Sequence, residues 1–311
     1  MNLAFVFPGQ GSQSVGMMAG FESLPAVRRT FDEASSALGV DLWTLVSSGP
    51  DEELNKTINT QPAMLVAGVA LFRAWQELGG AQPALLAGHS LGEYSALVAA
   101  GVFELTDAVP LVRFRAQAMQ EAVPEGQGAI AAILGLDDDA VRAVCVDAAD
   151  TGIAEAANFN SPGQVVIAGQ AAGVQRAIEL AKARGAKRAV LLPMSAPSHC
   201  SLMRPAAERL GEKLALMTMR PPRVRVINNA DVCAEEAPDR IRSALVRQLY
   251  SPVRWVESVT ALVSAGVQEV VECGPGAVLS TLCRRIAPGL RVMPLKDAAA
   301  MEALAMGSKG Q

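Results

Sequence analysis

The feature that most constrains the fold is the stretch GHSLGEYSAL at residues 88–97. It joins an apolar run to an amphipathic run through Gly88 and Gly92, which bracket Ser90. Glycines let a strand and a helix meet at a sharp turn, and such a turn presents a serine hydroxyl at the end of a sheet. The following helix would direct free N–H groups and its positive dipole end toward that hydroxyl. The pattern indicates a nucleophile elbow, although ordinary glycine-rich strand-to-helix turns share it.

Short apolar runs alternate with amphipathic segments along most of the chain. The apolar runs predict strands at 3–7, 83–87, 224–228, 267–272 and 290–295. Helical spacing predicts helices at 24–38, 61–78, 91–101, 106–122, 202–217, 239–249, 253–265 and 278–286. Strands that alternate with helices favour a mostly parallel, doubly wound sheet. The tail from Ala298 onward is expected to be frayed.

Residues 127–193 change character. They predict strands at 129–134, 153–158, 164–168 and 188–192, helices at 138–149 and 171–184, and a turn at 160–163. The order β-α-β-β-α-β is the ferredoxin-like arrangement. We therefore expect a large α/β catalytic domain formed by residues 1–126 and 194–311, with residues 127–193 inserted as a small ferredoxin-like subdomain.

The composition limits the classes of partner and the cellular compartment that we expect for this protein. Of the 311 residues, 50% are hydrophobic and 19% are charged, which predicts a globular chain with a sizeable core. A net charge of −4 gives no electrostatic footprint for nucleic acid or an anionic membrane. Five widely spaced cysteines without a Cys-x-x-Cys pair indicate free thiols in a reducing compartment. With no signal-peptide pattern and no apolar run long enough to span a membrane, we expect a cytoplasmic protein.

A serine nucleophile needs a base, and the chain has two histidines. His89 precedes Ser90 at a strand end, where adjacent side chains point to opposite faces, so we expect it to pack and hydrogen-bond beneath the elbow. His199 follows the last strand of the inserted unit in a loop, and we favour it as general base. We expect its neighbour Cys200 to be a buried thiol.

An acid that would orient the histidine is harder to find. Six aspartates between Ser90 and His199 fit the chain order of a Ser…Asp…His triad, but all of them fit helix caps or exposed helix positions better. These are Asp107, Asp137, Asp138, Asp139, Asp147 and Asp150. The residues alone give no convincing third member.

Arginine recognises carboxylates by paired hydrogen bonds, and two arginines lie on the helix after the elbow helix. Arg115 could return toward Ser90, and Arg113 lies two residues before it. Composition does not choose between them, and either could be a solvated helix charge.

Six motifs, in order and spread over nearly the whole chain, carry a resemblance to a known family. They are FPGQGSQ (7–13), TQPA (60–63), GHSLGEYS (88–95), NFNSPGQ (158–164), PSH (197–199) and VECGPG (271–276). Together they resemble the malonyl-CoA:acyl carrier protein transacylases of bacterial fatty acid synthesis. The resemblance implies a large α/β-hydrolase-like domain with a mostly parallel sheet and an inserted ferredoxin-like domain.

The resemblance also implies a ping-pong acyl transfer. Ser90 would attack the thioester of malonyl-CoA, His199 would take its proton, and the phosphopantetheine thiol of acyl carrier protein would then collect the malonyl group. It implies no cofactor and no metal. It implies acyl carrier protein and malonyl-CoA or coenzyme A as partners, and a monomer.

Further site residues follow from the same resemblance. The backbone N–H groups of Gln10 and Leu91 would hold the oxyanion, and Arg115 would pair with the malonyl carboxylate. The backbone carbonyl of Gln248 would orient His199 in place of a carboxylate. Three more residues match family positions near the acyl pocket: Gln61, Asn158 and Asn160.

Three other functions share parts of this pattern. A serine esterase or thioesterase shares the elbow and the base but needs no carboxylate clamp. A non-catalytic subunit that docks a carrier protein would form no adduct on Ser90. The malonyl-transfer subunit of a malonate decarboxylase would perform the same chemistry with a different carrier.

Overall fold

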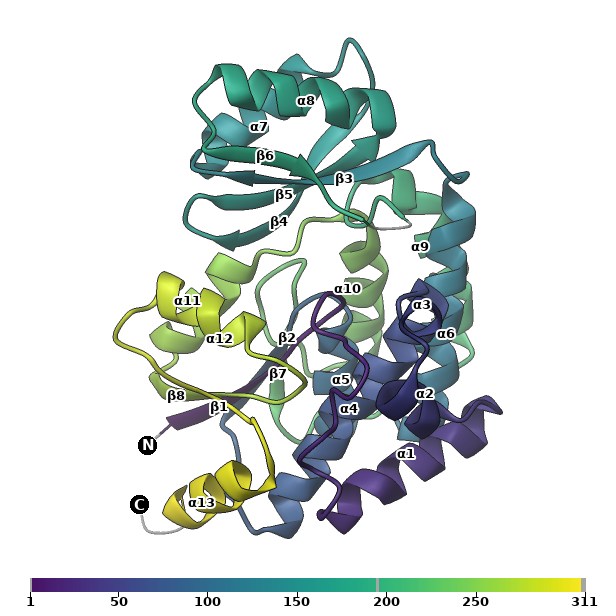
Figure 1. Cartoon of the computed structure of the whole chain (residues 1–311), viewed down its shortest axis with the longest axis vertical. Helices are drawn as coiled ribbons and strands as arrows, with labels where there is room; N and C mark the ends of the chain where they lie inside the picture. Colours follow the sequence, from purple (N-terminus) through teal and green to yellow (C-terminus); the bar gives the residue numbers. More distant parts are fainter. Residues whose placement is uncertain (1, 194–195, 309–311) are drawn as a thin grey trace.

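Two β-sheets organise the chain (Figure 1). The computed structural model describes residues 2–193 and 196–308. The first sheet has the strand order β7-β2-β1-β8-β9, and all its neighbouring strands run parallel. Its strands are β1 (Asn2–Phe7), β2 (Leu85–Gly88), β7 (Arg225–Ile227), β8 (Val267–Glu272) and β9 (Arg291–Pro294). The predicted parallel α/β sheet is therefore confirmed.

Helices cover both faces of this sheet, which is why its central strands β1 and β2 are nearly continuous apolar runs. Phe5 and Phe7 of β1 pack with the helices on one face, and Ala4 and Val6 pack with α11 and α12 on the other. The helices of the first face are α1 (Pro25–Leu38), α4 (Thr57–Glu77), α5 (Gly92–Ala99), α6 (Leu105–Ala122), α9 (Arg204–Ala215) and α10 (Pro238–Tyr250). Those of the second face are α11 (Trp255–Ser264) and α12 (Val278–Ile286).

The second sheet is antiparallel and has the strand order β4-β5-β3-β6. Its elements are β3 (Gly128–Leu134), α7 (Asp138–Asp147), β4 (Ala154–Ser161), β5 (Gln164–Gln170), α8 (Ala171–Ala183) and β6 (Arg188–Leu191). This is the predicted ferredoxin-like arrangement. Ala131 and Ile133 of β3 pack under α7 and α8, whereas Ile130 faces the other way and packs with Cys200. The expected domain boundary at residue 194 lies outside the described residues, so the division into domains stays a prediction.

The prediction of a frayed tail was wrong for residues 298–308. These residues form α13 (Ala298–Ser308), whose Met301 and Ala305 are buried against the large core. Asp297 caps the helix, because its carboxylate accepts from the Ala300 N–H at 2.7 Å. An N-cap aspartate followed by apolar residues at i+4 spacing was the overlooked signal. The end of the tail, residues 309–311, lies outside the described residues.

Some shorter elements also differ from the predictions. The helices α2 (Leu42–Ser48) and α3 (Asp51–Leu54) and the 3₁₀ turn η1 (Ser201–Met203) were not predicted. Strand β4 continues to Ser161, so Asn160 belongs to the strand and not to the predicted turn. No helix in the described part of the chain is long and apolar enough to cross a membrane.

Candidate active site

The turn between β2 and α5 depends on two glycines. A Cβ on Gly88 would lie 1.9 Å from the backbone of Gly92, and a Cβ on Gly92 would lie 1.9 Å from the carbonyl oxygen of Phe7. Ser90, between them, has a φ of 52°, in the left-handed region that non-glycine residues rarely adopt. Such a backbone costs about 1–3 kcal/mol and persists where the surroundings hold it. The sharp, strained turn expected of a nucleophile elbow is present.

The elbow serine contacts a histidine from a distant part of the chain. Ser90 Oγ lies 2.7 Å from His199 Nε2, and His199 Nδ1 lies 2.8 Å from the backbone carbonyl oxygen of Gln248. Because a carbonyl can only accept, Nδ1 carries the proton and Nε2 is free to accept from the serine. None of the six candidate aspartates occupies the orienting position. A backbone carbonyl takes the place of a triad carboxylate.

Burial, and next the nearby Arg115 cation, lower the pKa of His199 to about 3. The imidazole of the free protein is therefore neutral throughout the ordinary range of pH, which is the form a general base requires.

We expect the kcat/KM for malonyl-CoA to stay constant as the pH falls from about 7.5 to 5, because the neutral base is lost only near its lowered pKa. Initial rates at low substrate concentration across a buffer series measure this. A fall with a midpoint near the ordinary histidine pKa of about 6.5 would contradict the assignment.

Two backbone N–H groups lie beside the serine in sequence or in space. Neither the Gln10 nor the Leu91 N–H has an acceptor within residues 2–193 and 196–308. The loop that carries Gln10 packs tightly on the elbow, since a Cβ on Gly9 would lie 2.6 Å from the carbonyl oxygen of His89. The Leu91 N–H lies at the start of α5 and the Gln10 N–H in the loop after β1, and two such free donors suit an oxyanion. Their catalytic role stays a prediction.

The side chain of Arg115, on α6, contacts the serine. It is 1% exposed, and its Nη2 lies 3.3 Å from Ser90 Oγ and 3.2 Å from Gln248 Oε1. Its Nη1 donates to Gln61 Oε1 at 2.8 Å. Arg113 is half-buried on the same helix, and its side chain has no hydrogen bond or ion pair with any described residue. Of the two arginines that the sequence left open, only Arg115 is at the site.

A cavity of about 820 Å³ opens at the serine. Its lining includes Gln10, Ser90, His199, Asn158 and Asn160. Both asparagines come from β4 of the antiparallel sheet, so the cavity lies between the two sheets. Arg115 and Gln61 do not line it; they are buried and reach it through their bonds to Ser90 and Gln10.

His89 has the packing role that was expected. Its Nε2 lies 2.8 Å from Asn160 Oδ1, and its ring lies 5.5 Å from that of Trp255. Burial lowers its pKa. The neighbour of His199, Cys200, is fully buried, and burial raises the pKa of its thiol to about 12, which leaves it unreactive.

A polar network behind the elbow was not found from the sequence. Asn229 Oδ1 accepts from the Ser90 N–H at 2.6 Å, and Gln248 Nε2 donates to the Ser90 carbonyl at 3.0 Å. Both residues also donate to Oε2 of the buried Glu93, from Asn229 N at 2.9 Å and from Gln248 Nε2 at 2.8 Å. Burial raises the pKa of Glu93 to about 7 despite these bonds and the nearby Arg115 charge. The position of Asn229 just beyond a parallel strand was the available signal.

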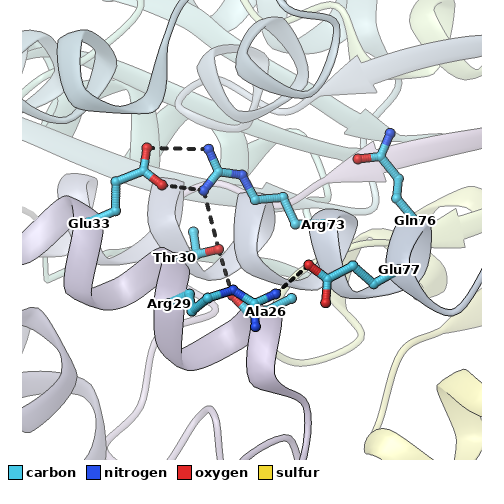
Figure 2. A pocket seen from close by; sticks show the side chains of 7 residues that line it. All are labelled: Ala26, Arg29, Thr30, Glu33, Arg73, Gln76 and Glu77. Carbon is cyan, nitrogen blue, oxygen red and sulfur yellow. Dashed lines mark hydrogen bonds and ion pairs between the residues drawn. The ribbon is translucent and has the colours of Figure 1, made fainter.

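A second cavity, of about 500 Å³, lies between α1 and α4 (Figure 2). Its charged side chains pair with one another: Arg73 bonds both carboxylate oxygens of Glu33, and Arg29 pairs with Glu77. Because these cations already have partners, the cavity offers no free charge for a ligand. Within the described residues, no cluster of histidine, cysteine or acidic side chains could hold a metal ion.

Comparison with known proteins identifies the family to which this fold belongs. A family model described as an acyl transferase domain matches residues 4–303. The Escherichia coli (strain K12) malonyl CoA-acyl carrier protein transacylase is 57% identical over 301 residues, which cover 96% of this chain and 97% of that protein.

Solved structures agree. The acyl-carrier-protein S-malonyltransferase from Burkholderia pseudomallei 1710b has a TM-score of 0.96 and 58% identity, over 98% of this chain and 99% of that one. A malonyl-transacylase solved in complex with its type II PKS acyl-carrier protein has a TM-score of 0.97 and 51% identity, over 99% and 100% of the two chains. The fold and the matches define the chain as an acyltransferase enzyme. It belongs to the malonyl CoA-acyl carrier protein transacylase family.

Proposed function

We propose that this enzyme moves the malonyl group of malonyl-CoA to the phosphopantetheine thiol of acyl carrier protein through an acyl-enzyme on Ser90. The observation that carries the proposal is the position of Ser90 Oγ, 2.7 Å from His199 Nε2 and 3.3 Å from Arg115 Nη2. One neighbour can take the serine proton, and the other can bind an acyl group that ends in a carboxylate.

In the first half-reaction, Ser90 Oγ forms a bond to the thioester carbon while its proton moves to His199 Nε2. The N–H groups of Gln10 and Leu91 hold the negative oxygen of the tetrahedral intermediate. One such donor is typically worth about 3–4 kcal/mol. The carbon–sulfur bond then breaks, and coenzyme A leaves with the proton from His199.

In the second half-reaction, the phosphopantetheine thiol gives its proton to His199 and attacks the malonyl ester. The bond from the acyl carbon to Ser90 Oγ breaks, and the serine recovers the proton. A weak base held by a carbonyl suits a transferase, because the acyl-enzyme must survive water until a thiol arrives.

The site supports several features of this proposal. A cavity of about 820 Å³ is of the size that holds ligands of this kind. We propose that the enzyme acts as a monomer without a metal or an organic cofactor, as the resemblance implies. The five cysteines are free thiols, which fits a reducing, cytoplasmic setting. We assign the activity to fatty acid synthesis, as the resemblance implies.

Intact-mass measurement of the wild-type protein tests the proposal. We expect a one-malonyl adduct after mixing with malonyl-CoA, much less adduct with acetyl-CoA, and loss of the adduct when holo acyl carrier protein is added. Apo acyl carrier protein, which lacks the thiol, is the matched control and should leave the adduct in place.

Each rival function gives a different result in that experiment. A docking subunit would show no adduct, and an esterase would lose its adduct to water at the same rate with either form of the carrier. A malonate decarboxylase subunit would keep its adduct with acyl carrier protein and release it only to its own carrier.

A further inference from the structure

Ser90 is held at both of its backbone polar groups by side-chain amides. Its N–H donates to Asn229 Oδ1, and its carbonyl accepts from Gln248 Nε2. The residue has a strained backbone, with a φ of 52°, which lasts only if its surroundings over-determine it. The two amides therefore hold the backbone from which the nucleophilic oxygen projects.

The chemistry of their neighbours fixes the orientation of both amides. Asn229 Nδ2 donates to the Gly88 carbonyl at 2.6 Å, so its oxygen must face the Ser90 N–H. Gln248 Oε1 faces Arg115, which can only donate, so its nitrogen must face Ser90. A 180° flip of either side-chain amide would place two hydrogen-bond donors or two acceptors opposite each other.

Both residues are anchored at a single atom. Glu93 Oε2, on the first turn of α5, accepts from the Gln248 side chain and from the Asn229 backbone N–H. These partners belong to α10 and to the segment after β7, so the carboxylate ties three parts of the chain together behind the elbow. Glu93 is 1% exposed, and it does not line the active-site cavity.

We propose that Glu93 is a positioning residue for the acylation of Ser90, acting through Asn229 and Gln248. The inference rests on the proposed function, from which it takes malonyl-CoA as the acyl donor. Asn229 and Gln248 both donate to Glu93 Oε2, and the proposed positioning requires a hydrogen-bond acceptor at the place of this atom. The other oxygen, Oε1, accepts no hydrogen bond from any described residue, and Glu93 lines a small cavity of about 10 Å³ with Asn228 and Glu235.

This geometry gives a matched pair of variants. Glu93→Gln can keep an oxygen at the Oε2 position and turn its NH₂ toward the small cavity and Glu235, so both anchoring bonds survive. Glu93→Ala removes the acceptor. We expect Glu93→Ala to lower kcat for malonyl transfer by about 100-fold with KM changed by less than about 3-fold, since misplacing a nucleophile slows the chemical step. Glu93→Gln should stay within about 5-fold of the wild type.

A second readout does not depend on malonyl transfer. A fluorophosphonate forms a bond from phosphorus to Ser90 Oγ, loses fluoride, and leaves the serine proton on His199, and intact mass follows its rate. We expect the fluorophosphonate to react with Glu93→Gln at nearly the wild-type rate and with Glu93→Ala much more slowly. If the wild type reacts with the fluorophosphonate but not with malonyl-CoA, the proposed function fails and the role of Glu93 is judged from this reagent alone.

Two results would overturn the inference: a folded Glu93→Ala protein as fast as the wild type, or Glu93→Gln as slow as Glu93→Ala. Thermal melting establishes that each variant is folded. If Glu93→Ala does not fold, Glu93→Asp replaces it, because the shorter side chain keeps a carboxyl group but withdraws the acceptor from Asn229 and Gln248. We then expect Glu93→Asp to be at least about 10-fold slower than Glu93→Gln, and the reverse order would overturn the inference.

Discussion

The Ser90→Ala variant is expected to take up no malonyl group and to lose malonyl transfer by about 10⁴-fold or more. The reason is that the Ser90 hydroxyl, which is bonded to His199, is the only group proposed to form the malonyl ester. Without the nucleophile, only substrate binding and oxyanion stabilisation still accelerate the reaction. Intact mass after incubation with malonyl-CoA measures the adduct, and transfer to holo acyl carrier protein measures the rate.

Ser198→Ala is the matched control. Ser198 lines the same cavity and precedes the histidine, but its hydroxyl has no bond to His199. This variant should keep the full adduct. An adduct that persisted in Ser90→Ala and disappeared in Ser198→Ala would reassign the nucleophile.

Arg115→Ala is expected to lower the kcat/KM for malonyl-CoA by about 100-fold while that for acetyl-CoA changes by less than about 10-fold. A hydrogen bond to a charged group is worth about 1.5–3 kcal/mol, and a carboxylate placed near a buried guanidinium gains most from it. Competition between malonyl-CoA and acetyl-CoA, followed by intact mass, gives the ratio directly.

Arg113→Ala tests whether the position matters or merely the charge. Arg113 lies on the same helix and is half-buried. Its replacement by alanine removes one positive charge, as Arg115→Ala does. We expect the malonyl preference to remain. If Arg115→Ala slowed both donors equally, Arg115 would be a support for Ser90 and Gln248 and not the selecting residue.

The local parts of the site could be predicted from the sequence, because they depend on neighbours in the chain. Gly88 and Gly92 sit where a Cβ would collide with the backbone, and apolar runs such as 3–7 mark buried parallel strands. The ferredoxin-like order could be predicted for the same reason. The sequence signal for each single strand, helix or turn lies within a short stretch of the chain.

The choice between Arg113 and Arg115 could not be made from the residues alone. Two positions apart on a helix lie about 200° apart around its axis, so one faces the core and the other does not. Which one faces Ser90 depends on how α6 packs against α4, a tertiary contact. The resemblance to a family, and not the pattern, selected Arg115.

The network behind the elbow was missed for a related reason. Glu93 reads as a common first-turn carboxylate, and its partners lie 136 and 155 residues further along the chain. No periodicity connects such residues. A buried carboxylate is visible only when the packing around it is known.

The low pKa of His199 ties recognition of the acyl group to proton transfer. Next to burial, the charge of Arg115 is the largest cause of that low pKa. A carboxylate bound to Arg115 would offset this charge, so the imidazole would gain affinity for a proton only while a charged acyl donor occupies the site. The guanidinium that we propose to bind the malonyl carboxylate would then take part both in acyl selection and in activation of the base.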